Sequence, residues 1–238
     1  MASSRARRDD VADDLINLGA IEFNRGRYAE AERYDREALE IMRDWYGSDH
    51  PETASAMTVL GRALFYQDRP DEAEPLLREA LAVQEQVYGD HPRVASALND
   101  LSGVLMHRGE FDEAERFSRR QIEIYRSVYG ERHPLVAIAL SNVASIDLLR
   151  ERFDSAKAIL GDVVERFSEA YSADDMNTAI ARIKLGRALI KQGRFAEAER
   201  ESRTGHDLLA GRTDPAVSWL RAARKDLVAA YEAVGRPE

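Results

Sequence analysis

Apolar and polar positions alternate along nearly the whole chain with the period of an α-helix. Between residues 28 and 46 the apolar positions are Ala31, Tyr34, Ala38, Leu39, Met42 and Trp45. The preceding segment has the same spacing, at Val11, Leu15, Leu18 and Phe23. Steps of three and four residues place such side chains on one face of a helix, where they can pack against a neighbouring helix. The pattern predicts two amphipathic helices joined by the turn "NRGR".

This pair of helices recurs about every 42 residues. The position after each turn is occupied by Tyr28, Pro70, Phe111, Phe153 and Phe195, at separations of 42, 41, 42 and 42 residues, and an alanine follows three positions later in every copy. A second column, within the first helices, holds Leu18, Leu60, Leu101, Val143, Leu185 and Leu227. A fixed period of this length is typical of a solenoid, in which each repeat buries its apolar face against the next one. The fold class predicted is therefore all-α, an α-solenoid of about five helix pairs followed by a C-terminal closing helix.

We expect a disordered tail at residues 1–8 and a single array over residues 9–238. The helix pairs are predicted at about 9–47, 51–89, 92–130, 134–172 and 175–211, and the closing helix at 214–234. The closing helix lacks a partner helix after it, and its apolar stripe holds Val217, Leu220, Leu227, Tyr231 and Val234. An uncovered apolar patch tends to find a partner, so we expect weak homo-oligomer formation through this end, or a longer natural protein.

The connection between successive pairs repeats as "YGSDHP", "YGDHP" and "YGERHP", which brings His50, His91 and His133 to equivalent positions. Stacked helices lie about 8–10 Å apart, whereas histidines that share a zinc ion each reach it at about 2 Å, so these three cannot form one metal site. The proline suits the first position of a helix, which leaves the histidine at the N-cap. Asp175 and Asp214 fill the same place in later copies, and aspartate is among the preferred N-caps. We therefore predict that the histidines cap helices.

The composition narrows the function. The 238 residues carry a formal net charge of −9 and no cysteine. An acidic surface disfavours nucleic acid and anionic membranes as partners, and a chain without cysteine forms no disulfide or zinc–thiolate site. The sequence has no apolar stretch of the length that spans a bilayer and no secretory signal pattern, so we expect a cytoplasmic protein. Nucleotide-binding, zinc-protease and serine-hydrolase motifs are also missing from it, and we predict a protein that is not an enzyme, with no catalytic residue, metal or cofactor.

The repeats resemble the tetratricopeptide repeat family, in particular the 42-residue variety found in kinesin light chains and many bacterial proteins. The resemblance is carried by the Leu–Gly pairs 18–19, 60–61 and 185–186, by "YAEAERYDREALEI" and "DEAEPLLREAL", and by the "YG…HP" connections. It extends from about residue 9 to residue 237. It implies a right-handed solenoid in which the first helix of each pair lines a concave groove that binds a partner.

On that mapping, the candidate peptide-binding residues are Thr58, Arg62, Tyr66, Asn99, His107, Ser141, Asn142, Lys184, Arg187 and Lys191. Ala20, Asn24 and Val59 occupy neighbouring groove positions. Four candidates are cations, whereas the groove columns hold two carboxylates, so the groove is expected to be locally positive and its partner an extended, net-acidic segment. Two amides one repeat apart, those of Asn99 and Asn142, are expected to hold the partner's backbone. The alternative is that these side chains simply face solvent.

The function favoured by these observations is a non-catalytic interaction scaffold or adaptor that binds an extended peptide or partner segment in its concave groove. Two alternatives stay open. The chain could be a self-assembly module whose exposed ends or convex surface mediate association. It could also be the regulatory or substrate-docking region of a larger protein, for example one that contains a kinase domain.

Overall fold

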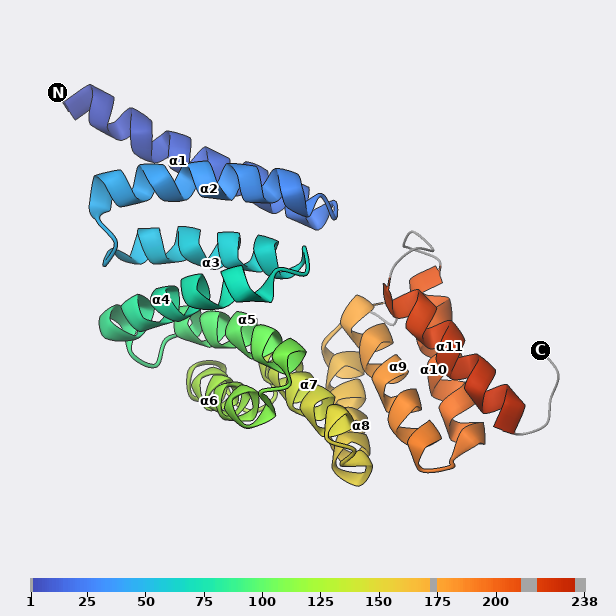
Figure 1. Ribbon diagram of the computed structural model, residues 1–238. Helices are drawn as coiled ribbons and strands as arrows, with labels where there is room; N and C mark the ends of the chain where they lie inside the picture. The colour runs from blue at the N-terminus through green and yellow to red at the C-terminus, as the bar shows by residue number, and fades with distance from the viewer. Residues whose placement is uncertain (1, 172–174, 211–217, 234–238) are drawn as a thin grey trace. The chain divides into compact units, whose positions relative to one another are not determined.

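The computed structural model describes residues 2–171, 175–210 and 218–233, and within these ranges the chain forms helices and no strand (Figure 1). The helices are α1 Ala2–Asn24, α2 Tyr28–Tyr46, α3 Pro51–Phe65, α4 Pro70–Tyr88, α5 Pro92–Arg108, α6 Phe111–Tyr129, α7 Pro134–Leu149, α8 Phe153–Ala170, α9 Met176–Lys191, α10 Phe195–Ala210 and α11 Ser218–Ala233. The all-α fold predicted from the hydrophobic pattern is confirmed. Residues 214–217 and residue 234 of the predicted closing helix lie outside the described ranges.

The first helix is longer than the sequence suggested. α1 begins at Ala2, so residues 2–8 are helical where a disordered tail was expected. That expectation was wrong because alanine and arginine, which make up most of the segment, are among the residues with the highest helix propensity. They extend the first helix without a break.

The chain divides into two compact units, residues 1–124 and residues 125–238, which we call unit 1 and unit 2. The division falls within α6, between Ile124 and Tyr125. Each repeat of a solenoid contacts only its neighbours, so a long array needs no single core. The sequence predicted one array because the repeat pattern passes this point without interruption.

Within each unit the helices pack in chain order. In unit 1, α1 packs on α2, α2 on α3, α3 on α4 and α4 on α5; in unit 2, α7 packs on α8, α8 on α9, α9 on α10 and α10 on α11 (Figure 1). The first helices of successive pairs also meet, because α1 contacts α3 and α3 contacts α5, while α7 contacts α9 and α9 contacts α11. Each unit therefore has a surface made of first helices side by side, which we call its first-helix face.

Small residues allow this close packing, and turns with positive φ end the first helices. The alanine that recurs three positions after each turn is fully buried in all five copies: Ala31, Ala73, Ala114, Ala156 and Ala198. In three of the turns a glycine takes the left-handed conformation, as at Gly26 with φ of 74°. In the other two turns Asp68 and Glu151 occupy that position with φ of 61° and 60°. A side chain in this conformation is strained, so these two turns are less favourable than the three that contain glycine.

The repeated histidines cap helices. The Nδ1 atoms of His50, His91 and His133 accept hydrogen bonds from backbone N–H groups two residues later, at 3.2, 3.1 and 3.3 Å. Asp175 does the same for the N–H of Thr178 at 3.0 Å. These bonds satisfy donors that a helix start leaves without an intrahelical acceptor. The capping role is confirmed at these four positions, whereas Asp214 lies outside the described residues.

The tyrosine of the same motif has a role that the sequence reading missed. The ring of Tyr46 stacks on His50 with centroids 4.2 Å apart, and Tyr129 stacks on His133 at 4.5 Å. The glycine between them, Gly47 or Gly130, has φ of 84° or 89° and turns the chain back on itself. The "YG…HP" motif is thus a unit in which the end of one helix holds the cap of the next.

Removal of one such cap should have a moderate effect on stability. We expect His91→Ala to lower the free energy of unfolding by about 1 kcal/mol, because the first turn of α5 loses its acceptor. His91→Asp should stay within about 0.5 kcal/mol of the wild type, since aspartate performs the same task at Asp175. Urea unfolding of the three proteins measures both values. An equal loss for aspartate and alanine would contradict the capping role.

In the parts of the chain that the structure describes, every helix is too short or too polar to cross a membrane.

Candidate functional site

The first-helix face of unit 1 contains two adjoining pockets of about 180 Å³ each. The α1–α3 pocket is lined by Gly19, Ala20, Phe23, Asn24, Asp35, Val59 and Arg62. The α3–α5 pocket is lined by Ser55, Thr58, Val59, Gln84, Arg93 and Ser96. Val59 belongs to both and separates them. Several positions that the sequence assigned to the groove, Arg62 and Thr58 among them, therefore lie in a hollowed part of the surface.

A buried carboxylate forms one wall of the α1–α3 pocket. Asp35 of α2 is 2% exposed, and its Oδ1 atom has no hydrogen-bond partner among the described residues. It fits there because Gly19 of α1 faces it, and a Cβ atom on Gly19 would come within 2.1 Å of that oxygen. Burial raises the pKa of Asp35 to about 7, although the positive charge of Arg62 opposes the shift. The sequence analysis missed this residue.

Arg62, a predicted cation of the groove, is paired within the chain. Its Nη2 and Nε atoms donate to Oδ2 of Asp100 on α5, at 2.8 and 3.2 Å. Burial raises the pKa of Asp100, while the charge and hydrogen bonds of Arg62 act against that rise. With both carboxylates ionised, Asp35, Arg62 and Asp100 together carry one negative charge.

Aromatic rings lie beside the α1–α3 pocket. Phe23, Tyr28 and Tyr66 form a cluster whose ring centroids are 5.0 to 5.2 Å apart. Tyr66, another predicted groove residue, is 53% exposed. Further along the face, the ring of His107 meets Phe65 edge-on at 5.9 Å, and its Nε2 atom lies 3.3 Å from Oδ1 of Asp68.

The α3–α5 pocket is lined by polar residues except at Val59. The hydroxyl of Thr58 donates to the carbonyl of Ala54 at 2.9 Å, and Nε2 of Gln84 lies 3.5 Å from that hydroxyl. Oε1 of Gln84 is a buried acceptor without a partner among the described residues. Asn99, on the next first helix, accepts from Nε2 of Gln121 at 3.4 Å. The pocket thus offers an amide oxygen to a ligand that can donate a hydrogen bond.

The remaining predicted residues lie in unit 2, where two of the three cations have partners within the chain. Nζ of Lys184 is buried and donates to Oγ of Ser141 at 2.9 Å, and burial lowers the pKa of Lys184 to about 8, with a further contribution from Arg187. Arg187 forms an ion pair with Asp226 of α11 at 3.0 Å. Lys191 is exposed at the end of α9.

These contacts correct the predicted charge of the groove. Arg62 and Arg187 meet carboxylates of the chain, and the sequence reading had not counted Asp35 and Asp226 among the groove charges. The positive excess expected from the residue columns is therefore cancelled in the folded chain. Asn99 belongs to unit 1 and Asn142 to unit 2, so the register proposed between these two amides stays a prediction.

The closing helix is better covered than its sequence suggested. Leu220 of the apolar stripe is 1% exposed and packs in a cluster with Ala179, Ile183, Leu209 and Ala223. Leu227 and Tyr231 are half-buried, and Val217 and Val234 lie outside the described residues. Weak self-association through this end stays a prediction.

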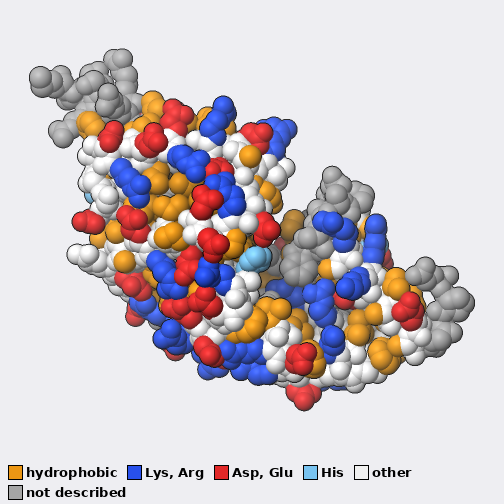
Figure 2. All heavy atoms as spheres, viewed as in Figure 1, with side chains coloured by type: hydrophobic (Ala, Val, Ile, Leu, Met, Phe, Trp, Pro, Cys, Tyr) orange, Lys and Arg blue, Asp and Glu red, His pale blue; other side chains and the backbone are white. Residues whose placement is uncertain are grey.

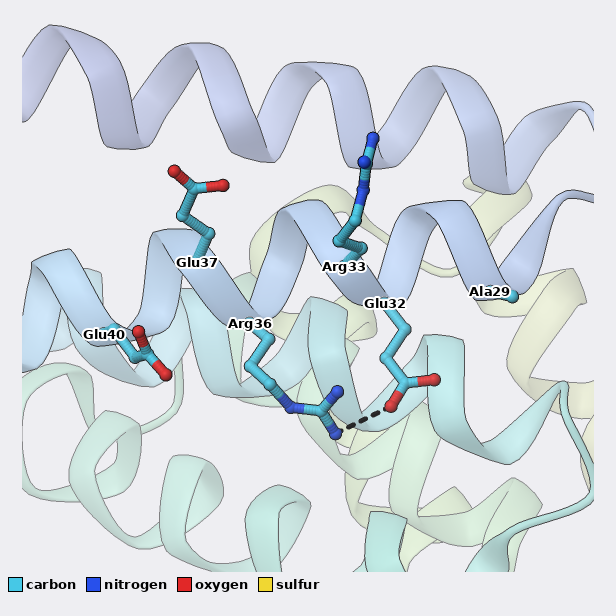
Figure 3. A pocket seen from close by; sticks show the side chains of 6 residues that line it. All are labelled: Ala29, Glu32, Arg33, Arg36, Glu37 and Glu40. Atoms are coloured by element: carbon cyan, nitrogen blue, oxygen red, sulfur yellow. Dashed lines mark ion pairs between the residues drawn. The ribbon is translucent and has the colours of Figure 1, made fainter.

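The outer face of the second helices has a different character. Figure 2 shows basic and acidic side chains interspersed over α2 and α4. A hollow of about 440 Å³ lies along α2. Glu32 and Arg36 meet there at 2.7 Å, while Arg33 and Glu37, which also line the hollow, point away from this pair (Figure 3). Glu32 also pairs with Arg69 at 2.8 Å and is buried. Paired charges of this kind are ordinary surface structure.

A metal centre finds no support in the described part of the chain, where no three histidine or acidic side chains converge as metal ligands. The first-helix face is therefore a candidate for binding, with two pockets, two buried acceptors and an aromatic border.

Comparison with known proteins decides the family. The family model of the tetratricopeptide repeat matches residues 11–86, 56–105, 93–169 and 136–209. The chain belongs to the tetratricopeptide repeat family. Its repeats and its fold point to a protein-interaction scaffold. No curated protein sequence matches the chain.

Three solved structures illustrate the fold that this chain shares with known proteins. A kinesin light chain-like protein of Podosopora anserina, with nearly identical TPR-like repeats, is 19% identical, covers 86% of this chain and 96% of its own, and has a TM-score of 0.68. BtubC (BKLC) from P. vanneervenii is also 19% identical, over 91% and 94%, with a TM-score of 0.68. A Rap protein complexed with competence and sporulation factor is 16% identical, over 91% of this chain and 61% of its own, with a TM-score of 0.75. At these identities the likeness shows the fold.

Proposed function

We propose that this protein is a non-catalytic interaction scaffold that binds an extended segment of a partner protein along the first-helix face of unit 1. The observation that carries the proposal is the pair of pockets on either side of Val59. Each contains a buried acceptor that has no hydrogen-bond partner among the described residues, Oδ1 of Asp35 in one and Oε1 of Gln84 in the other. A scaffold that needed only stability would fill such positions with apolar or satisfied side chains, because a buried acceptor that lacks a hydrogen bond is destabilising.

An extended segment suits the geometry. Successive first helices lie roughly 10 Å apart, and an extended chain rises about 3.3 Å per residue, so about three residues separate the two pockets. One side chain could enter the α1–α3 pocket while a backbone N–H group donates to Gln84. The Rap protein complexed with competence and sporulation factor is a precedent for this fold in a complex.

The partner need not be acidic. The acidic segment expected from the sequence depended on four cations, of which Arg62 and Arg187 are paired with carboxylates and Lys184 is buried against Ser141. Their charges are therefore largely used within the chain. A non-catalytic role is proposed because the pockets hold an isolated carboxylate and an ion-paired arginine, with no adjacent nucleophile and base.

Selection from a library of random dodecapeptides displayed on phage tests this function. We expect the full chain to enrich a family of peptides, and Val59→Arg, which places a long charged side chain between the pockets, to reduce their binding at least tenfold. Glu37→Arg on the outer face of α2 is the matched control and should leave binding unchanged, because Glu37 points away from α3 (Figure 3). Circular dichroism spectra of both variants are the check that each one is folded.

The opposite pattern would favour the alternatives. Peptides that bind Val59→Arg normally and are lost with Glu37→Arg would assign recognition to the outer face. Sedimentation that shows a concentration-dependent dimer, together with no enrichment of any peptide, would favour self-assembly.

A further inference from the structure

The α1–α3 pocket of unit 1 has a chemical feature that packing does not require. Asp35 occupies the second-helix position that faces the small residue of the Leu–Gly column. At the equivalent position the other repeats carry Leu77, Ser118, Leu160 and Ser202. Leu77 packs over Gly61, and Ser118 hydrogen-bonds Ser102 at 2.8 Å. The fold therefore accepts leucine or serine here, and the first repeat alone places a carboxylate at this position.

That carboxylate is directed into a cavity. Asp35 lines the α1–α3 pocket together with residues of α1 and α3, and it is almost completely buried. The pocket volume of about 180 Å³ equals the space of roughly six water molecules. This is room for one side chain of a partner.

The charges around the pocket favour a cation. Arg62 from α3 is the charged group that faces Asp35, and its Nε and Nη2 atoms are engaged by Asp100 of α5. The residues that α1 contributes, Gly19, Ala20, Phe23 and Asn24, are uncharged. On α2 itself, Glu32 and Arg36, which flank Asp35, pair with each other. Within the part of the chain that the structure describes, one carboxylate charge is thus left without a cation at hydrogen-bond distance.

The walls of the pocket suit the same ligand. Phe23 lines it and belongs to the ring cluster with Tyr28 and Tyr66. Aromatic faces attract ammonium and guanidinium groups. Ala20 and Val59 offer apolar contact to the methylene stem that arginine and lysine carry.

We propose that the α1–α3 pocket binds a cationic side chain, arginine or lysine, of the partner segment, and that Asp35 is its counter-ion. The inference rests on the proposed function, since the side chain belongs to the segment held on the first-helix face. It reverses the sign of charge expected from the sequence for this part of the groove.

Binding should be linked to a proton. The pKa of Asp35 is raised to about 7 in the free protein by burial, so near neutrality this carboxyl group is partly protonated. A bound cation favours the ionised form, and binding therefore releases a proton below pH 7. The fraction ionised rises about tenfold between pH 6 and pH 8 for a group with this pKa, so affinity should rise up to about tenfold over that range.

Titration of the full chain with small amino-acid derivatives tests the pocket directly. The probes are the N-acetyl methylamides of arginine, lysine and citrulline, of which citrulline matches arginine in shape without its charge. We expect saturable shifts of the Ala20 and Val59 amide signals in NMR spectra with arginine and lysine, and binding at least fivefold weaker with citrulline. The arginine affinity should rise with pH as described.

Two variants in α2 distinguish the effect of the Asp35 carboxylate from the effect of general surface charge. Asp35→Asn preserves the shape of the side chain and should reduce arginine binding at least tenfold and remove its pH dependence. Glu37→Gln removes a carboxylate from the exposed side of α2 and should leave both unchanged. Equal binding of arginine and citrulline, or arginine binding that survives Asp35→Asn, would overturn the proposal.

The peptide library distinguishes this inference from the function on which it rests. Peptides selected through the first-helix face should be enriched in arginine or lysine at one position. The Asp35→Asn variant should select peptides that lack this preference. Peptides that need Val59 but carry no basic residue would overturn the cation pocket and leave the scaffold proposal standing. Arginine derivatives that bind through Asp35, with no peptide that depends on Val59, would support the pocket and contradict the scaffold.

Discussion

Replacement of Asp35 with leucine is expected to stabilise the chain by about 3 kcal/mol at pH 8. The substitution removes a buried carboxylate whose Oδ1 atom has no hydrogen-bond donor among the described residues, which is unfavourable by about 1–3 kcal/mol, and it buries additional apolar surface. Leucine fits this position, since Leu77 packs over Gly61 in the second repeat as Asp35 does over Gly19 in the first. Chemical denaturation in urea measures the difference.

The stability gained by Asp35→Leu should depend on pH, and the pKa of Asp35 determines the direction of this dependence. That pKa is about 7 in the folded chain, against an ordinary value of 3.8. Between these values the folded protein keeps a proton that the unfolded protein has lost, so the stability of the wild type falls as pH rises from about 4 to about 7. Two pH units at about 1.4 kcal/mol each correspond to roughly 3 kcal/mol between pH 5 and pH 7 as an upper limit. The advantage of Asp35→Leu should therefore shrink to about 1 kcal/mol or less at pH 5.

Ser202 provides the control, because it occupies the same column without a charge. Ser202→Ala should change stability by a similar amount at pH 5 and pH 8. A stability difference between Asp35→Leu and the wild type that is independent of pH would show that Asp35 is ionised at both pH values.

The second large effect is expected at the arginine that bridges two first helices. Arg62→Ala should lower the free energy of unfolding by about 2–3 kcal/mol, because it leaves the buried carboxylate of Asp100 without its ion-pair partner and removes the positive charge of Arg62 from beside Asp35. The double variant Arg62→Ala with Asp100→Asn should recover more than half of the loss, since no uncompensated charge remains at position 100. Urea unfolding of the single and double variants measures both.

Arg119 is the matched control for this experiment. It pairs with Glu115 one turn away on α6, and its side chain is 67% exposed. Exposed pairs of this kind contribute about 0.5 kcal/mol or less, so Arg119→Ala should have little effect. A loss at Arg62 no larger than the loss at Arg119 would contradict the role given to the Arg62–Asp100 pair.

The sequence predicted the repeat architecture well because the relevant forces are local and repeated. Apolar spacing defined the helices, glycine defined the turns at Gly26 and its equivalents, and the His–Pro motif defined the caps. Each of these signals depends on residues within a few positions of one another, and each occurs several times. The structure confirms them at bonds such as that from the Glu52 N–H group to Nδ1 of His50. The division into two units has no such local signal.

The charge of the groove could not be predicted in the same way. It depends on which side chains meet across neighbouring repeats, and a count of charges in columns does not include that information. Arg62 meets Asp100 38 residues later, and Arg187 meets Asp226 39 residues later. Both intervals equal the length of one repeat minus about one helical turn. The pairing was therefore readable in principle from the register, by a search for opposite charges at that interval.

Asp35 was overlooked for a related reason. In α2 it stands between the apolar positions Ala31 and Ala38, and taken alone it looks like one more acid of a charged helix. Alignment of the five repeats places it in a column with two leucines and two serines, which marks it as a core position. Its direction toward Gly19 and the pocket, however, is a property of the packed helices.

The central claim, that a partner segment lies along the first-helix face of unit 1, is tested most directly by mapping a bound peptide on the full chain. The measurement is the change in backbone amide NMR signals when a dodecapeptide selected from the library is added to saturation. We predict that the largest changes fall on residues that line the two pockets, such as Ala20, Val59 and Ser96. Changes confined to the outer face of α2 and α4, with these signals unmoved, would contradict the account.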